Sequence, residues 1–353
     1  MSFKDALQHG PPRVAALETE RLRAAGIGGA AAVARAAALL RAGATVAFPT
    51  ETVYGLGANA FDPAAVAKIF AAKQRPAWDP LIVHVDGPEM LARVALLPLE
   101  LRPAAEALMT AFWPGPLTLL LPRSAAVPDA VTAGRPLLGV RIPAHQLARE
   151  LVRQAGVPVA APSANRFGRP SPTTAAHVLA DLDGRIDAVL DGGPTRVGVE
   201  STVLDVREMA IYRPGAVTAA MVSRVLGGEV RVLDKAAVAD RAALASPGMG
   251  MRHYAPRARL ELVRGQAELL LEVAQHAPWE VGVMLPEGWD AGAARAVFRW
   301  APWGDAEILA RRLFAGLRML DDREVVAIVC PVPEMGGLGE ALRDRLDKAS
   351  RRE

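Results

Sequence analysis

The chain has 353 residues, of which 51% are hydrophobic and 22% charged, so it is long enough for two domains and too apolar for wholesale disorder. Lysine and arginine total 41 against 38 acidic residues, and this net charge of +3 does not predict nucleic-acid binding. Cys330 is the single cysteine, which excludes a disulfide within the chain. Because Cys330 and the six histidines show no metal-ligand spacing, a zinc site is not expected.

Residues 1–28 are expected to form an N-terminal extension, because this segment is largely polar and lacks the apolar core of a signal peptide. The apolar stretch 30–40 is too short to span a bilayer. We therefore expect a cytoplasmic protein that does not interact with membranes.

Helical and strand patterns alternate through residues 29–227 and predict the first domain. Asp62 and Pro63 favour the start of a helix, since aspartate caps a helix N-terminus and proline fits its first turn. Strands are expected at 44–48, 81–85, 117–121, 138–142, 157–161, 188–190, 202–206 and 210–212. Other helices are expected at 30–41, 101–112, 145–154, 174–182 and 218–226. Strict strand–helix alternation is lacking, which favours a mixed, curved sheet over a doubly wound one.

The periodicity is lost over residues 228–257, which are expected to form a linker and active-site lid. It returns at 258–353, where strands and helices alternate regularly. The second domain is therefore predicted to be a small, Rossmann-like parallel α/β unit.

Four segments of the first domain place polar residues at the ends of predicted strands or helices, where ligands commonly bind in α/β proteins. Residues 49–57 read PTETVYGLG and follow the first strand, and 73–85 read KQRPAWDPLIVHV, with two cations beside a helix end. Residues 161–173 read APSANRFGRPSPT, and GVESTV at 198–203 is followed by YRPG at 212–215. A fifth segment, SPGMGMRHYAP at 246–256, lies in the expected linker.

Each of these segments also has an ordinary structural explanation. Lys73 and Arg75 suit a phosphate, but basic residues also cap helix C-termini. Ser, Asn, Gly and Pro favour turns without any ligand, and a lone histidine in a strand is usually a core residue. The glycines at 55 and 57 match a dinucleotide fingerprint only formally, because no helix opens there. The combination of segments is therefore more informative than any one.

Together, these segments and WPGPLT at 113–118 resemble the YrdC-like family of threonylcarbamoyl-AMP synthases. The linker and the late sequence GLGEALRDRLDKAS at 337–350 look like the long form, which carries an extra C-terminal domain. The resemblance implies a twisted, mainly parallel α/β sheet around a deep, positively charged cavity. It also implies synthesis of threonylcarbamoyl-AMP from threonine, bicarbonate and ATP, with Mg²⁺ bound to the nucleotide.

The resemblance also implies residue roles, carried over by motif. The residues expected to contact threonine are Thr52, His84, Arg141, Ala161 and Ser201. Those expected to contact ATP are Arg75, Asp79, Leu137, Ser163, Asn165, Ser171, Arg213 and His253. Lys73 and Arg75 are the candidates for holding the bicarbonate and phosphate charge during catalysis. No protein side chain is expected to bind the metal by itself.

Two of these positions depart from the pattern of the family. Asp79 stands where the family usually has Asn, and an acid near a triphosphate requires neutralisation by Mg²⁺ or an arginine. Leu137 stands where a hydroxyl residue is frequent, so a polar contact is missing or is made by the backbone.

Other functions remain open from the sequence. A carbamoyl-adenylate domain of the hydrogenase-maturation type would bring zinc fingers, against which the single cysteine argues. A protein binding double-stranded RNA or the ribosome is the non-catalytic alternative, which the balanced charge weakens. A dinucleotide oxidoreductase ranks last. For the synthase, the expected partner is a transferase that modifies the adenosine beside the tRNA anticodon, with weak tRNA or double-stranded RNA binding as a further expectation.

Overall fold

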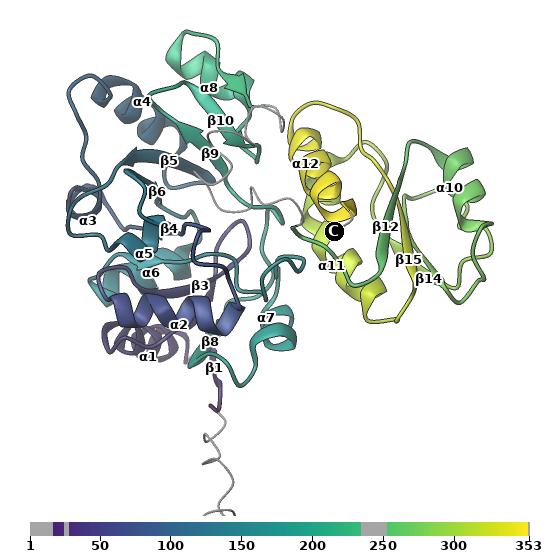
Figure 1. Cartoon of the computed structure of the whole chain (residues 1–353), viewed down its shortest axis with the longest axis horizontal. Helices are drawn as coiled ribbons and strands as arrows, with labels where there is room; N and C mark the ends of the chain where they lie inside the picture. Colours follow the sequence, from purple (N-terminus) through teal and green to yellow (C-terminus); the bar gives the residue numbers. More distant parts are fainter. Residues whose placement is uncertain (1–16, 25–27, 234–252, 352–353) are drawn as a thin grey trace, which may run out of the picture.

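The computed structural model describes residues 17–24, 28–233 and 253–351, which form two α/β domains around separate sheets (Figure 1). Most of the N-terminal extension (1–16 and 25–27) and much of the linker (234–252) lie outside the described residues. None of the helices within these ranges is long and apolar enough to cross a membrane.

The larger domain contains an 11-stranded sheet in the order β1-β8-β2-β3-β7-β4-β6-β5-β9-β10-β11. The sheet contains parallel pairs such as β4–β6 and β5–β9 and antiparallel pairs such as β2–β3 and β5–β6, so it is mixed as expected. Its strands are β1 (Glu20–Arg23), β2 (Val46–Pro49), β3 (Tyr54–Asn59), β4 (Ile82–His84), β5 (Leu117–Pro122), β6 (Leu137–Arg141), β7 (Val159–Ala160), β8 (Ala188–Asp191), β9 (Thr202–Asp205), β10 (Ala210–Arg213) and β11 (Arg231–Val232).

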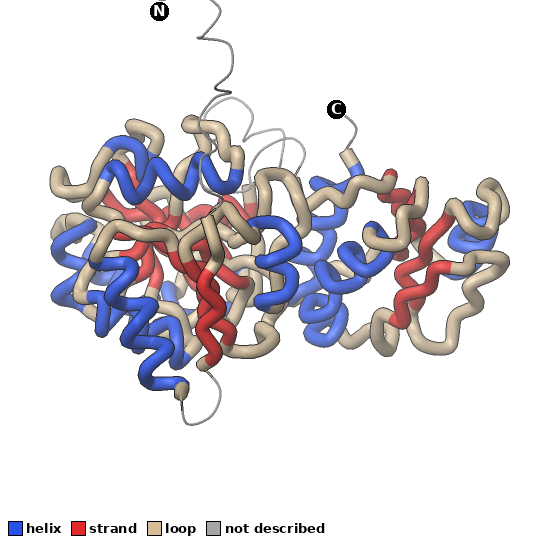
Figure 2. The backbone as a smooth tube through the Cα atoms, turned by 90° about the horizontal axis from the view of Figure 1, so that it is seen from below, coloured by secondary structure: helices blue, strands red, loops and turns tan. Residues whose placement is uncertain are grey.

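Helices surround this sheet, as Figure 2 shows. They are α1 (Gly29–Arg41), α2 (Pro63–Lys73), α3 (Pro88–Val94), α4 (Arg102–Phe112), α5 (Asp129–Thr132), α6 (Gln146–Ala155), α7 (Ala175–Leu182) and α8 (Ala219–Leu226). The predicted start of α2 is confirmed, because the Asp62 carboxylate accepts hydrogen bonds from the backbone N–H groups of Ala64 and Ala65.

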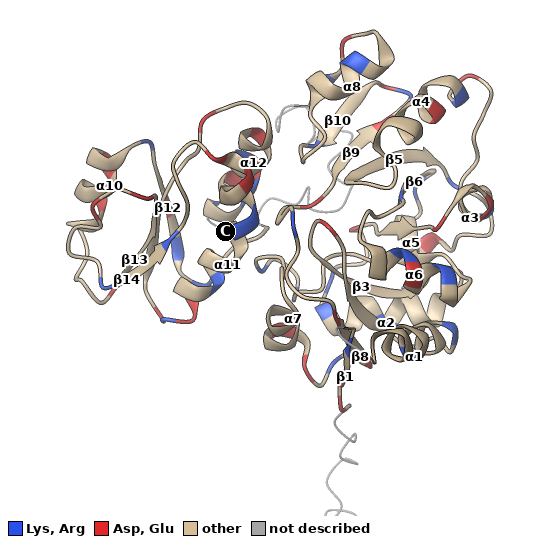
Figure 3. Ribbon diagram, turned by 180° about the vertical axis from the view of Figure 1, so that it is seen from behind, with Lys and Arg blue, Asp and Glu red and all other residues tan. Residues whose placement is uncertain are grey.

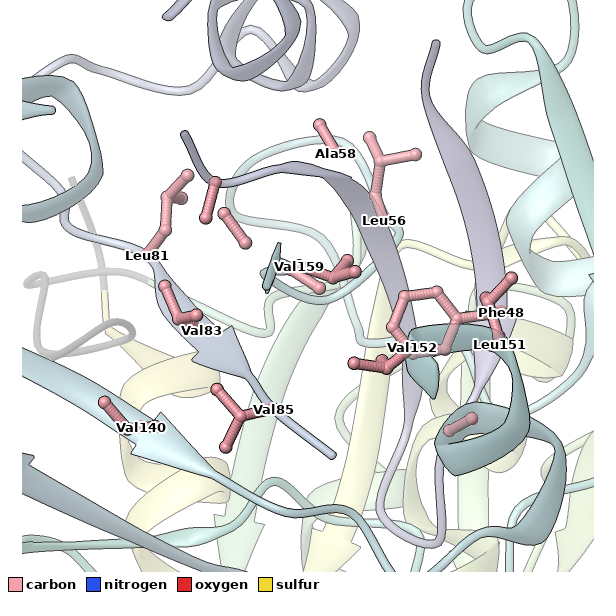
Figure 4. Packing of buried hydrophobic residues seen from close by; sticks show 14 of the residues in the cluster. Phe48, Leu56, Ala58, Leu81, Val83, Val85, Val140, Leu151, Val152 and Val159 are labelled. Carbon is pink, nitrogen blue, oxygen red and sulfur yellow. The ribbon is translucent and has the colours of Figure 1, made fainter. Parts of the chain in front are cut away.

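A buried apolar cluster holds the sheet against its helices. Phe48, Leu56, Val83 and Val159 are fully buried members of this cluster and lie among the side chains shown in Figure 4. Full burial of such a side chain contributes roughly 1.5–3 kcal/mol, so this core fixes the strands whose ends carry the polar segments.

The smaller domain contains a four-stranded sheet in the order β12-β15-β13-β14, and all three of its strand pairs are parallel. The predicted parallel α/β architecture is thus confirmed. Its elements are β12 (Arg259–Val263), α10 (Gln266–Val273), β13 (Val281–Leu285), β14 (Ala296–Arg299), α11 (Ala306–Asp321), β15 (Ala327–Pro331) and α12 (Leu338–Ser350). Figure 1 shows α11 and α12 on the side that faces the larger domain, whereas α10 covers the opposite face.

Three strands of the larger domain were not expected from the sequence. β11 lies within residues 228–257, which were expected to form the linker, but it pairs in parallel with β10, so the sheet extends beyond the expected domain end at residue 227. β1 pairs in parallel with β8, so part of the expected N-terminal extension belongs to the sheet. β3 runs antiparallel to β2 after a turn at residues 50–53, which places the two glycines of the formal dinucleotide fingerprint inside a strand. That geometry offers no helix N-terminus to a pyrophosphate, so the match to the fingerprint is only formal, as expected.

Ion pairs join the two domains along α11 and α12. Arg318 of α11 binds Asp181 at 2.6 Å, and Arg169 binds Asp321 of α11 at 3.0 Å. The backbone at Gly198 packs tightly here, because a Cβ at this position would lie 2.3 Å from the Cα atom of Arg311. The two domains therefore pack through a close, charged contact.

The contact at Gly198 gives a prediction about stability. Gly198 and Gly193 both have positive φ, at 84° and 82°, but a Cβ at Gly193 would meet nothing within 4 Å. Replacing either glycine by alanine strains the backbone, whereas only Gly198→Ala also forces the two domains apart. We expect Gly198→Ala to lower the free energy of unfolding by about 1–3 kcal/mol more than Gly193→Ala, as measured in urea. Equal losses would mean that the contact with α11 is not tightly packed.

Candidate active site

A cavity of about 50 Å³ lies among strand ends of the larger domain and the end of the linker. Nine of the fourteen site residues expected from the sequence line it. These nine are Thr52, Arg75, His84, Arg141, Ala161, Ser163, Ser201, Arg213 and His253. The other lining residues, not singled out as ligand contacts, are Thr50, Val53, Gly55, Ile82, Pro162, Glu200 and Tyr254.

A turn between β2 and β3 presents two threonine hydroxyls. β2 ends at Pro49, one residue beyond the expected end, and the Thr50 hydroxyl donates to the carbonyl of Val53 at 2.6 Å and closes a turn. Thr52 follows in this turn, and the hydroxyl oxygens of Thr50 and Thr52 lie 2.8 Å apart. This pattern is a side-chain-to-backbone turn, which competes with strand continuation for Ser and Thr.

Arg141 ends β6 and is buried beside this turn. It donates from Nη1 to the Thr52 hydroxyl at 3.2 Å and from Nη2 to the Glu51 carboxylate at 3.4 Å. Its Nε–H has no hydrogen-bond partner among the described residues. Burial lowers the pKa of Arg141, although Glu51 opposes this change. A buried guanidinium with a spare donor suits an anionic ligand such as a carboxylate.

His84 lies on β4, next to Arg141 on β6. Its ring contacts Phe48 edge-on, with the ring centroids 5.9 Å apart, and its Nδ1 has no partner within the described part of the chain. Burial, followed by the nearby charge of Arg141, holds the pKa of His84 well below its usual value of 6.5. The imidazole is therefore neutral at physiological pH and can exchange hydrogen bonds with a ligand without gaining charge.

Arg213 ends β10 and forms the opposite wall of the cavity. It donates from Nε to the Ser201 carbonyl at 3.0 Å and from Nη2 to the Ser201 hydroxyl at 3.1 Å. The same hydroxyl lies 2.8 Å from that of Thr118 on β5. Burial lowers the pKa of Arg213, so this charge also favours an anionic neighbour.

Lys73 and Arg75 follow one another at the end of α2. The Lys73 ammonium group is buried behind the cavity wall and donates to the backbone carbonyls of Ser163 and Asn165 at 2.5 Å each. Arg75 lines the cavity and donates to the backbone carbonyls of Asp79 and Pro80 at 3.1 and 2.8 Å. Burial lowers the pKa of both side chains. Lys73 thus fixes the 163–165 loop, while Arg75 is the cation that faces the cavity.

Asp79 forms a buried ion pair with Arg75, with 2.8 Å between Oδ2 and Nη2. The carboxylate does not line the cavity, so the arginine supplies the neutralisation that the sequence required at this position. Burial raises the pKa of Asp79, while Arg75 and Lys73 oppose that rise.

Three other predicted residues lie outside the cavity lining. Leu137 begins β6 and packs against the apolar cluster that contains Ile82 and Leu120. Asn165 donates to the backbone carbonyls of two arginines in its own loop, and Ser171 donates to the Glu200 carboxylate. Asn165 and Ser171 therefore shape the loop that borders the cavity.

The end of the linker covers the cavity. His253 and Tyr254 line it, and the ring of His253 contacts Phe167 with centroids 5.5 Å apart. The N–H of Ala255 donates to the Gly168 carbonyl at 2.7 Å, which ties this segment to the 161–173 loop. Of the expected lid, only this end and residues 228–233 are described.

The charge around the cavity is strongly positive. Three arginines (75, 141 and 213) line it against one acid, Glu200, which is already paired. Within the described ranges, the one group of three potential metal ligands lies in the smaller domain, where Glu261, Glu272 and His276 come together. The cavity itself is therefore built for anions and offers no carboxylate cluster to a metal.

Two family models match the chain. The model described as telomere recombination, for the Sua5, YciO and YrdC proteins, matches residues 38–215. The model described as the C-terminal domain of threonylcarbamoyl-AMP synthase matches residues 217–351. Together they cover both sheets except β1.

Curated relatives and solved structures match nearly the whole chain. The threonylcarbamoyl-AMP synthase of Pyrococcus abyssi is 43% identical over 325 residues, covering 89% of this chain and 93% of the relative. The Bacillus subtilis protein of the same name is 43% identical over 331 residues, covering 90% and 92%. The structure of P. abyssi Sua5 complexed with L-threonine has a TM-score of 0.84 at 42% identity, covering 94% of this chain and 97% of that one.

The buried, neutral side chain of His84 gives a prediction about how stability depends on pH. The pKa of His84 is well below 6.5, so below pH 6.5 the unfolded chain takes up a proton that the folded chain does not. The folded state therefore loses stability as pH falls, and for His84 this loss is at most about 2 kcal/mol at pH 5, a limit set by the unfolded pKa of 6.5. Urea unfolding of His84→Gln should show a correspondingly smaller loss between pH 7 and 5 than the unchanged protein. Between pH 8 and 7, the free energies of unfolding of the two proteins should change equally. An equal loss in both proteins down to pH 5 would show that His84 is protonated in the folded state.

Proposed function

Because the chain belongs to the threonylcarbamoyl-AMP synthase family, we propose that its cavity condenses threonine, bicarbonate and ATP into threonylcarbamoyl-AMP and pyrophosphate. The observation that carries this proposal is the set of three buried arginines around one small cavity, with hydroxyl groups between them. These charges are arranged for a substrate with two anionic ends, an amino-acid carboxylate and a polyphosphate.

In this proposal, threonine occupies the side of the cavity formed by β4, β6 and the turn at residues 50–53. The unpaired Nε–H of Arg141 would bind the amino-acid carboxylate, with the Thr52 hydroxyl beside it. Neutral His84 would hydrogen-bond the amine or hydroxyl without repelling it, while Ala161 and Ser201 line the remaining wall.

ATP would lie on the side formed by Arg75, Ser163, Arg213 and His253. The two arginines would bind phosphate oxygens, and Ser163 would donate from its hydroxyl. Asn165 and Ser171 would act by holding the loop in shape. Lys73 would stabilise the same loop and add positive potential from behind the wall.

The reaction requires no nucleophile from the protein. The threonine amine combines with bicarbonate to give a carbamate and water, and a carbamate oxygen then attacks the α-phosphorus of ATP. The bond from this phosphorus to the oxygen bridging to the β-phosphate breaks, and pyrophosphate leaves with the electron pair. Arg75 and Arg213 would stabilise the charge that builds on the phosphates, so catalysis consists of positioning and electrostatics.

Mg²⁺ is expected to arrive with ATP and to neutralise part of the triphosphate charge. The two carboxylates nearest the nucleotide side, Asp79 and Glu200, are each already paired with an arginine. This donor set fits a metal held mainly by phosphate oxygens and water rather than by the protein.

The size of the cavity implies movement on binding. About 50 Å³ accommodates a few water molecules, whereas small-molecule sites usually measure roughly 300–1,000 Å³. His253 and Tyr254 cover the nucleotide side, so we infer that this segment moves outward when ATP enters and closes again over the bound substrates. The product would then pass to a transferase acting on the adenosine beside the tRNA anticodon.

The proposed reaction predicts a specific substrate requirement. With ATP and Mg²⁺ present, pyrophosphate release should need both threonine and bicarbonate, and serine should support it less well. Arg75→Ala should abolish the release while the protein stays folded, because it removes a phosphate-binding charge. Release that ignores threonine, or no release from folded protein, would exclude this synthase activity.

Asp79 gives a second prediction, since its carboxylate adds negative charge near the expected phosphates. The backbone carbonyls of Asp79 and Pro80 would still hold Arg75 in Asp79→Asn. Removing one buried charge at roughly 10 Å should lower the KM for ATP about three- to tenfold, and should leave the KM for threonine unchanged. Asp79→Ala is the matched control, because it removes the same charge without leaving an amide. Weaker ATP binding in both variants would show that the ion pair matters more for placing Arg75 than for the local potential.

A further inference from the structure

Arg345 lies on α12 in the smaller domain, yet its side chain contacts Glu200, which lines the cavity of the larger one. It is wholly buried and binds the Glu200 carboxylate, with 2.8 Å between Nε and Oε2. It also donates from Nη1 to the Pro214 carbonyl at 3.0 Å. One guanidinium group thus contacts both GVESTV and RPG, two segments that border the cavity.

Glu200 connects Arg345 to the proposed nucleotide side. The carboxylate lines the cavity, and its other oxygen accepts a hydrogen bond from the Ser171 hydroxyl. Burial acts to raise the pKa of Glu200, but Arg345 and Arg213 outweigh it and hold the pKa below its usual value. The ionised carboxylate therefore binds the 161–173 loop through one oxygen and Arg345 through the other.

The same helix anchors the end of the linker. The guanidinium of Arg345 lies 5.3 Å from the centre of the Tyr254 ring, within the range of a cation–π contact. One turn further along α12, the Lys348 carbonyl accepts a hydrogen bond from the N–H of His253 at 3.3 Å. Figure 3 shows that α12 carries both basic and acidic residues and lies on the side of the smaller domain that faces the larger one.

We propose that Arg345 is a positioning residue for the nucleotide side of the site, holding Glu200, the Ser171 loop and Tyr254 in the geometry that binds ATP. This proposal rests on the proposed function. It assigns the smaller domain a direct part in the site.

The threonine side should not depend on Arg345. Thr52 and Arg141 are held by contacts with each other and with Glu51, all within the larger domain. Other ion pairs, such as Arg318 with Asp181, also join the domains, but their carboxylates do not line the cavity. Loss of Arg345 should therefore affect the two substrates unequally, which general loosening of the domain contact would not do.

The test compares Arg345→Met and Arg345→Lys with Arg311→Ala. Arg311 is a suitable control because it donates across the same domain boundary, to the Arg196 carbonyl at 2.9 Å, but is exposed and does not line the cavity. Calorimetry would measure the Kd of a non-hydrolysable ATP analogue and, separately, of L-threonine, using the full chain. The KM values for both substrates in pyrophosphate release would complement the binding data.

We expect Arg345→Met to raise the Kd of the ATP analogue at least tenfold and to leave the Kd of threonine within twofold. Arg345→Lys should recover part of the loss, because lysine keeps the charge opposite Glu200 but not the second donor for Pro214. Arg311→Ala should change neither Kd. If Arg345→Met does not fold, a rise of threefold or more in the analogue Kd of folded Arg345→Lys would still support the proposal.

Equal weakening of both ligands, or no change in analogue binding by folded Arg345 variants, would overturn the positioning role. The proposed function fails separately, if the unchanged protein binds the analogue but shows no threonine-dependent pyrophosphate release. An unchanged protein that binds neither ligand would overturn both.

Discussion

The burial of several arginines around one cavity is the constraint on which the rest of the structure depends. Arg75, Arg141 and Arg213 are each almost completely shielded from water, where a charge is costly unless it is paired and hydrogen-bonded. Arg75 is held by Asp79 and two backbone carbonyls, and Arg141 is held by Glu51 and Thr52. Arg213 is held by Ser201. Among the described residues, the Nε–H of Arg141 still has no hydrogen-bond partner. In the proposed function, an anionic substrate would accept this hydrogen bond.

The mixed sheet makes this arrangement possible. Arg141 and Arg213 are the last residues of β6 and β10, and these strands sit on either side of β5 and β9 in the sheet. The apolar residues that precede each arginine pack into the core, so strand register decides where each charge lies. A slip of one residue would move the charges to the other face of the sheet. The apolar core and the polar site are thus fixed by the same pairing.

Much of the site could be predicted from the sequence because its polar residues follow short apolar strands. Arg141 and Arg213 were expected at strand ends from the local pattern alone, whereas the role expected of His84 came from the family resemblance.

The turn at Thr50 was missed, because a threonine that hydrogen-bonds its own backbone looks the same in sequence as one in a strand. β1 was missed because its burial alternates weakly in a polar segment. Asp79 and Asn165 make mostly local contacts, and Ser171 bonds the distant Glu200. A motif names these residues but does not show that they lie behind the cavity lining.

The pairing of Glu200 with Arg345 was beyond prediction for a different reason. The two residues are separated by 145 positions, and Arg345 stands in the sequence RDRLDK, where alternating charges suggest local pairs on an exposed helix. Such local pairs do form, since Asp344 binds both Arg345 and Lys348. Yet Arg345 is fully buried, and burying this charge against Asp344 alone would leave the rest of its guanidinium donors unsatisfied. Glu200 and the Pro214 carbonyl supply the missing acceptors, so docking of α12 and completion of the cavity wall occur through the same contacts. The smaller domain therefore supports the wall of the candidate site through α12 and is not an independent unit attached to it.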